Sequence, residues 1–178
     1  MKKDKPPVDR RRQGAAARTQ GKAFEDRLQA AFDYYRVRGV ASIEKTPEPM
    51  KVLRSMGKGQ FLSCFVKKAQ PDFEGTVRGG RSWMLEAKFT ATDRLEQNRV
   101  LPSQTDYLNR HHELGAKCYV IAGFSTGNVY KVPWETWRDM KDRFGRKYVR
   151  EADLEIFRVE TAPDGRLKLL KKGAFEND

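Results

Sequence analysis

Apolar residues recur at helical spacing in the first quarter of the chain. One helical stripe holds four large apolar residues, Phe24, Leu28, Phe32 and Tyr35. Positions three or four apart share a helix face, so this spacing predicts a helix. We expect it to begin near residue 20 and to end at Gly39, because glycine commonly closes helices.

Strand patterns follow this helix, with glycine and proline between them. We expect five strands, over residues 39–45, 72–77, 81–89, 117–124 and 128–132. The segment 117–124 is almost continuously apolar, which predicts a strand that is buried on both faces. The segment 90–100 is polar, and we expect a loop there.

The remaining elements are predicted by single residues. Pro102 begins a second helix, since proline is favoured in a first helical turn, and Gly115 ends it. Trp134 and Trp137 lie in a short third helix as core or support residues. The pair Asp164-Gly165 predicts the turn of a weak hairpin over residues 154–170.

The segment 50–68 stands out because it is basic and only loosely alternating. Pro47 and Pro49 precede it, and Gly57-Lys58-Gly59 predicts a turn at its centre. We interpret the segment as a protruding hairpin, or stalk, inserted between two strands. The alternative is an ordinary third hairpin of the main sheet.

The order of these elements predicts the fold class and the domain limits. Helices that alternate with strands indicate an α/β fold, a mixed β-sheet flanked by helices, and 178 residues suffice for one core. We expect a disordered basic arm over residues 1–18, a main domain over 19–160 and a C-terminal tail or hairpin over 161–178. The alternative for the arm is a passive, solvated tail.

Positive charge is concentrated in two segments of a chain whose net charge is +12. Residues 1–20 hold seven Lys or Arg against two Asp, and residues 45–68 hold six against one Glu. Such segments favour a polyanion partner, and nucleic acid is the first candidate. The expected DNA contacts are Arg10, Arg11, Arg12, Lys51, Arg54, Lys58, Lys67 and Lys68.

The composition argues against a membrane role or a disulfide-stabilised fold. No apolar run is long enough to span a bilayer, and no signal peptide is visible. Cys64 and Cys118 are isolated from each other, so neither a disulfide framework nor a zinc site is indicated. We expect a cytoplasmic protein, nucleoid-associated or in the host cytoplasm if a phage encodes it.

Two acids and a lysine carry the candidate chemistry. Asp72 is the first residue of the strand 72–77, and Glu86 and Lys88 share one face of the strand 81–89, since alternate side chains point the same way. A three-residue turn at 78–80 would place Asp72 directly opposite Glu86, whereas a two-residue turn would place it on the other face. Two adjacent carboxylates repel unless a cation joins them, and their hard oxygen atoms suit Mg²⁺ or Mn²⁺. The alternative is a surface strand that ends in a salt bridge.

The chain resembles the PD-(D/E)xK nuclease superfamily and, within it, the RecU-type Holliday junction resolvases of bacteria and phages. The matching stretches are 21–25, 44–49, 72–75, 85–88, the helix with Gln104, 119–124, and 144–147 with 153–154. The resemblance covers roughly residues 20–158. Gln70-Pro71 stand where many members carry small hydroxyl residues.

This resemblance implies a restriction-endonuclease-like core and a homodimer that cuts four-way DNA junctions in recombination and repair. It implies a stalk that enters the junction centre and metal binding by Glu25, Asp72 and Glu86. We expect the Ala87 carbonyl to join these ligands. Lys88 and Gln104 would help to position a water molecule and the scissile phosphate.

Other functions stay open at this point. One alternative is a nuclease of the same fold that acts on ordinary duplex or forked DNA. Another is a non-catalytic, junction-binding architectural protein, and a third, an RNA-binding accessory protein, has only the net charge in its favour. The sequence also leaves open whether a recombinase or a branch-migration helicase is a protein partner.

Overall fold

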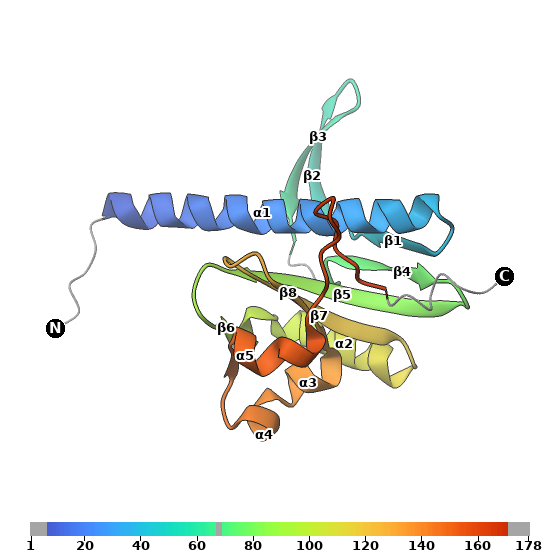
Figure 1. Ribbon diagram of the computed structural model, residues 1–178. Coiled ribbons are helices and arrows are strands. Elements are labelled where there is room, and N and C mark those ends of the chain that lie inside the picture. Colours follow the sequence, from blue (N-terminus) through green and yellow to red (C-terminus); the bar gives the residue numbers. More distant parts are fainter. Residues whose placement is uncertain (1–6, 67–68, 171–178) are drawn as a thin grey trace.

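The computed structural model describes residues 7–66 and 69–170. A five-stranded mixed sheet forms its centre, with one long helix on one face and shorter helices on the other (Figure 1). The predicted α/β class, a mixed sheet flanked by helices, is therefore confirmed. The two predicted basic residues Lys67 and Lys68 lie outside the described residues.

The long helix α1 (Pro7–Val37) begins earlier than predicted. Residues 7–18 continue the helix instead of forming a disordered arm, and only residues 1–6 of the predicted arm lie outside the described part. The sequence AAARTQGKA has few residues that oppose helix formation, since alanine, glutamine, arginine and lysine are favourable in helices. None of the described helices is both long and apolar enough to cross a membrane.

The central sheet has the strand order β1-β4-β5-β7-β8. Its strands are β1 (Ala41–Lys45), β4 (Phe73–Val77), β5 (Arg81–Thr90), β7 (Lys117–Phe124) and β8 (Val129–Pro133). The β5–β7 pair is parallel and the other three pairs are antiparallel. All five predicted strands are present, with small differences at their ends.

Both faces of this sheet are covered, and β5 contributes to both cores. Trp83, Leu85 and Ala87 lie in the core under α1, as the alternation of the strand predicts. Met84 lies in the opposite core, beneath the helices that follow β5. Glu86 points to that second side and is fully buried.

The second core lies beneath short elements, some of which the sequence did not predict. They are β6 (Leu95–Glu96), the 3-10 turn Gln97–Arg99, α2 (Pro102–Glu113), α3 (Trp134–Arg138), α4 (Met140–Phe144), β9 (Tyr148–Val149), α5 (Glu151–Leu154) and the 3-10 turn Glu155–Phe157. The predicted polar loop over 90–100 was therefore wrong in part, because β6 pairs with β9. The pairing partner lies about fifty residues away, so the local pattern gave no sign of it.

The predicted C-terminal hairpin is also shorter than expected. Residues 154–157 are helical, and the two sides of the turn are linked by the bridge between Thr161 and Leu167 and by the hydrogen bonds from the Ala162 and Lys168 N–H groups to the carbonyls of Arg166 and Glu160. Gly165 has a φ of 84°, the left-handed conformation that the Asp164-Gly165 pair predicted.

The segment between β1 and β4 forms a hairpin apart from the sheet. It consists of β2 (Met50–Gly57) and β3 (Gln60–Phe65), which pair only with each other in the described part of the chain. It projects beyond α1 (Figure 1), and every side chain of β2 is exposed. The protruding hairpin is confirmed, and the alternative of a third hairpin of the main sheet is wrong.

A single glycine allows β1 to approach β4. A Cβ atom at Gly75 would lie 1.9 Å from the Ser42 carbonyl oxygen, well inside any allowed contact. Gly75 pairs directly with Ile43, so a side chain here would push apart the strand pair that leads to Asp72.

We predict that Gly75→Ala lowers the free energy of unfolding by about 1–3 kcal/mol or more, the usual cost of forcing extra volume into a packed site. The matched control is Gly21→Ala in α1, where a Cβ atom would meet nothing within 4 Å. That change should stabilise the protein by about 0.5–1 kcal/mol, because alanine is the better helix former. Urea denaturation of both variants measures this, and equal effects would contradict the close approach at Gly75.

Candidate active site

The turn between β4 and β5 sets the position of both acids. Val77 pairs with Arg81 and Phe73 with Leu85, so residues 78–80 form a three-residue turn. Gly79 and Gly80 have φ values of 87° and 78°, which only glycine adopts readily. The predicted register is therefore confirmed, and one step beyond Phe73 it brings Asp72 opposite Glu86.

Asp72 continues the pairing of β5 through its side chain. Its Oδ2 accepts a hydrogen bond of 3.0 Å from the backbone N–H of Ala87, at a point where β4 has already ended. Its backbone carbonyl accepts a second bond of 2.9 Å from the N–H of Thr46, just after β1. These two contacts fix the carboxylate at the edge of β5.

Glu86 lies beside Asp72 and is fully buried. Its side chain is 0% exposed, its Oε1 forms an ion pair with Lys88 Nζ, and its Oε2 has no hydrogen-bond partner among the described residues. Burial raises the pKa of Glu86 to about 7; the charge of Lys88 opposes this shift and that of Asp72 adds to it. A buried oxygen atom without a partner is costly, so the pair is poised to accept a cation.

A divalent cation fits the atoms that the structure brings together. Two carboxylates with a partnerless oxygen are the hard donors that Mg²⁺ and Mn²⁺ prefer. The Ala87 carbonyl lies on the same edge, because the N–H and C=O of one extended residue point to the same side. The predicted ligands Asp72, Glu86 and Ala87 thus occupy one place, and Lys88 is next to them.

The predicted fourth ligand, Glu25, has a different partner in the structure. Its Oε2 lies 2.7 Å from Lys45 Nζ, and the described residues contain no group of three or more acidic, His or Cys side chains able to hold a metal ion. The hydrogen bond to Glu25 raises the pKa of Lys45, and the charge of Asp72 adds to this effect. Lys45 is therefore attracted to both Glu25 and Asp72. A metal role for Glu25 stays a prediction.

Gln104 is buried in the first turn of α2, as predicted, but its amide oxygen has a structural partner. It accepts a hydrogen bond of 3.1 Å from the Leu101 N–H and so caps its own helix. Its predicted role toward a water molecule or the phosphate stays a prediction.

The sequence did not indicate two further polar groups beside the site. Tyr107 lies one turn after Gln104 and donates a 3.1 Å hydrogen bond to Glu74. Glu74 follows Asp72 by two residues, so the two acids point to the same face of the sheet. Burial raises the pKa of Tyr107, the bond to Glu74 adds to this, and a hydrogen bond from Gln70 opposes it. The other group is the hydroxyl of Thr46, which is buried without a partner among the described residues. Thr46 stands in the matching stretch 44–49, the one signal that pointed to it.

The predicted DNA-binding residues are dispersed over two elements. Arg10, Arg11 and Arg12 lie in α1, while Lys51, Arg54 and Lys58 lie on the exposed hairpin β2–β3.

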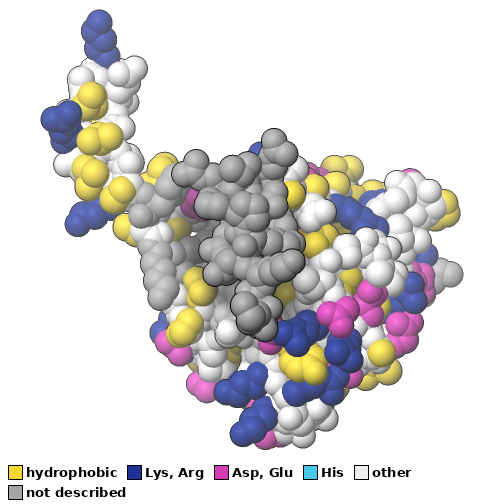
Figure 2. Space-filling view, turned by 90° about the vertical axis from the view of Figure 1, so that its left-hand side faces the viewer, with side chains coloured by type: hydrophobic (Ala, Val, Ile, Leu, Met, Phe, Trp, Pro, Cys, Tyr) yellow, Lys and Arg dark blue, Asp and Glu magenta, His cyan; other side chains and the backbone are white. Residues whose placement is uncertain are grey.

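The hairpin β2–β3 has two different faces. Opposed residues share a face, and the register places Lys51 and Arg54 on one side and Met50, Val52 and Phe61 on the other. These three apolar side chains are 62%, 56% and 58% exposed. The projecting hairpin shows both kinds of side chain on its surface (Figure 2).

We expect the free energy of unfolding of the metal-free protein to fall as the pH rises from about 5 to about 8. The folded state holds a proton on Glu86 up to about pH 7, whereas the ordinary glutamate pKa is 4.5. Between these values the folded state binds the proton more tightly, so raising the pH removes stability. The loss from this group is about 2–3 kcal/mol, measured by urea denaturation in the presence of a chelator.

Glu86→Gln is the matched control, because the amide has the shape of a protonated carboxyl group and does not ionise. Its stability relative to the unsubstituted protein should rise by a similar amount over the same pH interval. An identical pH dependence of the two proteins would contradict the raised pKa.

The chain that forms this site matches a protein family. The family model RecU, Recombination protein U, matches residues 19–171. A Holliday junction resolvase RecU from Geobacillus kaustophilus is 27% identical over 164 residues (84% of this chain, 79% of the relative), and one from Streptococcus pneumoniae is 26% identical over 148 residues (76% and 75%). A solved structure of Archaeoglobus fulgidus Hjc, a Holliday junction resolvase, aligns with a TM-score of 0.47 and 13% identity over 77% of this chain and 88% of that chain. Because the family model covers most of its length, the chain belongs to the RecU family.

Proposed function

We propose that this protein is a metal-dependent endonuclease that resolves four-way DNA junctions in recombination and repair. The observation that carries the proposal is the buried pair Asp72 and Glu86 with Lys88 beside it. A buried carboxylate with a partnerless oxygen destabilises the metal-free fold, so a catalytic role explains it better than a structural one. The names of the RecU relatives support junction DNA as the substrate.

The residues of the site suit phosphodiester hydrolysis. Mg²⁺ or Mn²⁺ held by Asp72, Glu86 and the Ala87 carbonyl would offset the negative charge that builds on the phosphate and lower the pKa of a water molecule. The Lys88 ammonium, 16% exposed, presents a positive charge on the same face. Lys88 can therefore orient the attacking water and stabilise the developing charge.

The hairpin β2–β3 suits the centre of a junction. Its basic face, with Lys51 and Arg54, fits phosphates, and its exposed apolar face fits the bases that are less completely stacked where four arms meet. Phosphates are present on any duplex, so only the contacts of the apolar face would distinguish the junction from an uninterrupted duplex of the same arms.

A homodimer fits the symmetry of the substrate. A four-way junction has approximate two-fold symmetry, and two symmetric nicks require two active sites. A two-fold dimer supplies both through one kind of interface. Sedimentation at working concentration tests this, and a monomer would contradict it.

We expect Asp72→Asn to abolish cutting of a synthetic four-way junction while leaving its binding close to normal. The change removes a ligand charge at the scissile phosphate, whereas basic residues elsewhere supply most of the affinity. The measurement compares the junction with a linear duplex of the same arms, with Mg²⁺ and with EDTA. Paired symmetric nicks in the junction alone, lost with EDTA or in the variant, are the expected result.

The matched control is Asp164→Asn, an exposed aspartate that pairs with Arg166 in the C-terminal turn. It should cut normally. Normal cutting by Asp72→Asn would show that the site is elsewhere. Equal cutting of junction and duplex would indicate a general nuclease, and tight junction binding without any cutting would indicate an architectural protein.

We also expect the two faces of the hairpin to contribute differently to binding. Lys51→Gln with Arg54→Gln should reduce the slope of log affinity against log salt by about 2, close to one unit per lost phosphate contact. Val52→Ser with Phe61→Ser should leave that slope unchanged and lower the preference for the junction over the duplex. Fluorescence anisotropy with labelled DNA in EDTA measures both effects.

The control for this experiment is Arg36→Gln with Lys168→Gln, two exposed cations that pair with Asp33 and Glu160. It should alter neither the slope nor the preference. A hairpin whose basic face could be neutralised without effect would not be a DNA contact.

A further inference from the structure

A third basic region, in addition to the two basic segments that the sequence shows, lies beyond the end of β5. The segment 140–150 holds five Lys or Arg against one Asp, and β9 within it pairs with β6. Figure 2, which views the side where α1 begins, shows Lys and Arg side chains gathered on the lower part of that face.

One aromatic ring is the centre of this surface. The guanidinium groups of Arg94, Arg146 and Arg150 lie 5.0, 5.0 and 5.7 Å from the centroid of the Tyr148 ring. Arg146 and Arg150 flank Tyr148 in the sequence, whereas the pairing of β6 with β9 brings Arg94 to the ring from a distant segment. We call Tyr148 and these three arginines the Tyr148 platform.

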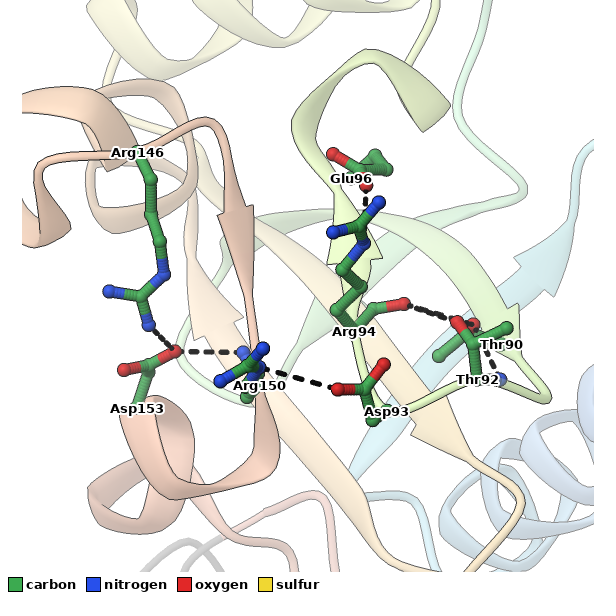
Figure 3. Close-up of polar contacts among 8 residues, drawn as sticks. All are labelled: Thr90, Thr92, Asp93, Arg94, Glu96, Arg146, Arg150 and Asp153. Carbon is green, nitrogen blue, oxygen red and sulfur yellow. Dashed lines mark hydrogen bonds and ion pairs between the residues drawn. The ribbon is translucent and has the colours of Figure 1, made fainter. Parts of the chain in front are cut away.

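The carboxylates around the platform hold its arginines with unequal strength. Arg146 forms a partly buried ion pair with Asp153, at 2.5 Å. Asp153 also accepts a hydrogen bond of 2.8 Å from the backbone N–H of Arg150. Arg146 therefore has a structural role, because it holds the carboxylate that fixes this segment. Arg150 lies 3.4 Å from Asp93 (Figure 3), and their side chains are 53% and 73% exposed. Exposed pairs of this kind contribute little to stability, so a phosphate can replace Asp93.

Two threonine side chains fix the backbone of Arg94. Thr90 and Thr92 both donate hydrogen bonds to its carbonyl oxygen, at 3.1 and 2.9 Å. Its side chain is 50% exposed and pairs with Glu96 (Figure 3). The guanidinium is thus held in place over the ring and accessible to solvent, the state in which an arginine binds phosphate at little ordering cost.

The platform lies within reach of the DNA that would continue from the active site. Arg94 is the sixth residue after Lys88, so their Cα atoms are at most about 20 Å apart. One DNA strand advances about 3.4 Å per phosphate, so this span covers about six nucleotides. A cleft of about 540 Å³ lies between α1 and residues 89–99, and Arg94 and Arg99 line it.

We propose that the Tyr148 platform binds the phosphate backbone of one duplex arm within about six nucleotides of the cut. The inference rests on the proposed function, because it takes the substrate to be junction DNA. Arg94 and Arg150 contact phosphates directly, while Arg146 holds the segment in place. The platform adds affinity and register for the arm but no base specificity, since phosphate contacts carry no sequence information.

The test uses Arg94→Gln with Arg150→Gln in the full-length protein, with junction binding measured in EDTA over a series of salt concentrations. The slope of log affinity against log salt should fall by about 2, and affinity at 0.1 M salt should fall on the order of tenfold to a hundredfold. Arg94→Lys with Arg150→Lys should recover most of the slope, because it keeps the charge. An unchanged slope in the glutamine variant overturns the proposal.

Two arginines around another tyrosine provide the matched control. Arg38 and Arg166 lie 4.6 and 3.3 Å from the centroid of the Tyr34 ring, so Arg38→Gln with Arg166→Gln removes the same groups from a similar setting. This variant should bind as the unsubstituted protein does. If it lowers the slope as much as the platform variant, the effect is one of net charge, and the proposal is wrong.

The position of the contact is tested with neutral methylphosphonates placed singly along one strand. Those within about six nucleotides on one side of the cut should weaken binding by the unsubstituted protein and have little further effect on the glutamine variant. Equal effects on both proteins at every position overturn the proposal. Failure of the unsubstituted protein to cut the junction would refute the proposed function instead, which keeps the two failures apart.

Discussion

The whole site depends on the register of one hairpin. Side chains alternate along a strand, so a slip of one residue between β4 and β5 would move Glu86 and Lys88 to the opposite face from Asp72. The three-residue turn at 78–80 prevents that slip, and the Asp72–Ala87 hydrogen bond continues the pairing by one step after β4 ends. Gly75 also supports this register, because the absence of a side chain there lets β1 lie close enough to fix the start of β4.

Once this register has placed Glu86 inside the second core, burial determines the direction of its pKa shift. A carboxylate inside the second core is costly to ionise, and one lysine does not fully compensate it, as the pKa of Glu86 near 7 indicates. A structural salt bridge would be expected to satisfy both oxygen atoms of Glu86, but one has no partner among the described residues. The fold therefore gives up stability at the position where a cation would restore it, a common feature of catalytic sites.

Much of the fold and the centre of the site could be predicted because their determinants are local. The alternation in β5, the paired glycines and the proline before α2 each act within a few residues. The start of α1 was missed because basic composition suggested disorder, although the residues favour helix. The β6–β9 pair was missed because its partners lie far apart in sequence. The ion pair between Glu25 and Lys45 depends on how α1 packs beside β1, and this packing cannot be predicted from a local sequence pattern.

The same distinction explains why charge counting found two basic surfaces and overlooked a third. In residues 90–99 two arginines are balanced by two acids, so this stretch reads as neutral until folding places Arg94 over Tyr148 from the other segment. Net charge per segment shows the excess of Lys and Arg in 140–150 but not that Arg94 joins it, although phosphate affinity depends on which cations are held exposed together. These basic residues lie away from Glu86, so the pKa of that carboxyl group is set by its burial and by its neighbours Lys88 and Asp72. Under the proposed function, this separation would let the protein bind DNA without a metal ion, and the cation would be needed only for cutting.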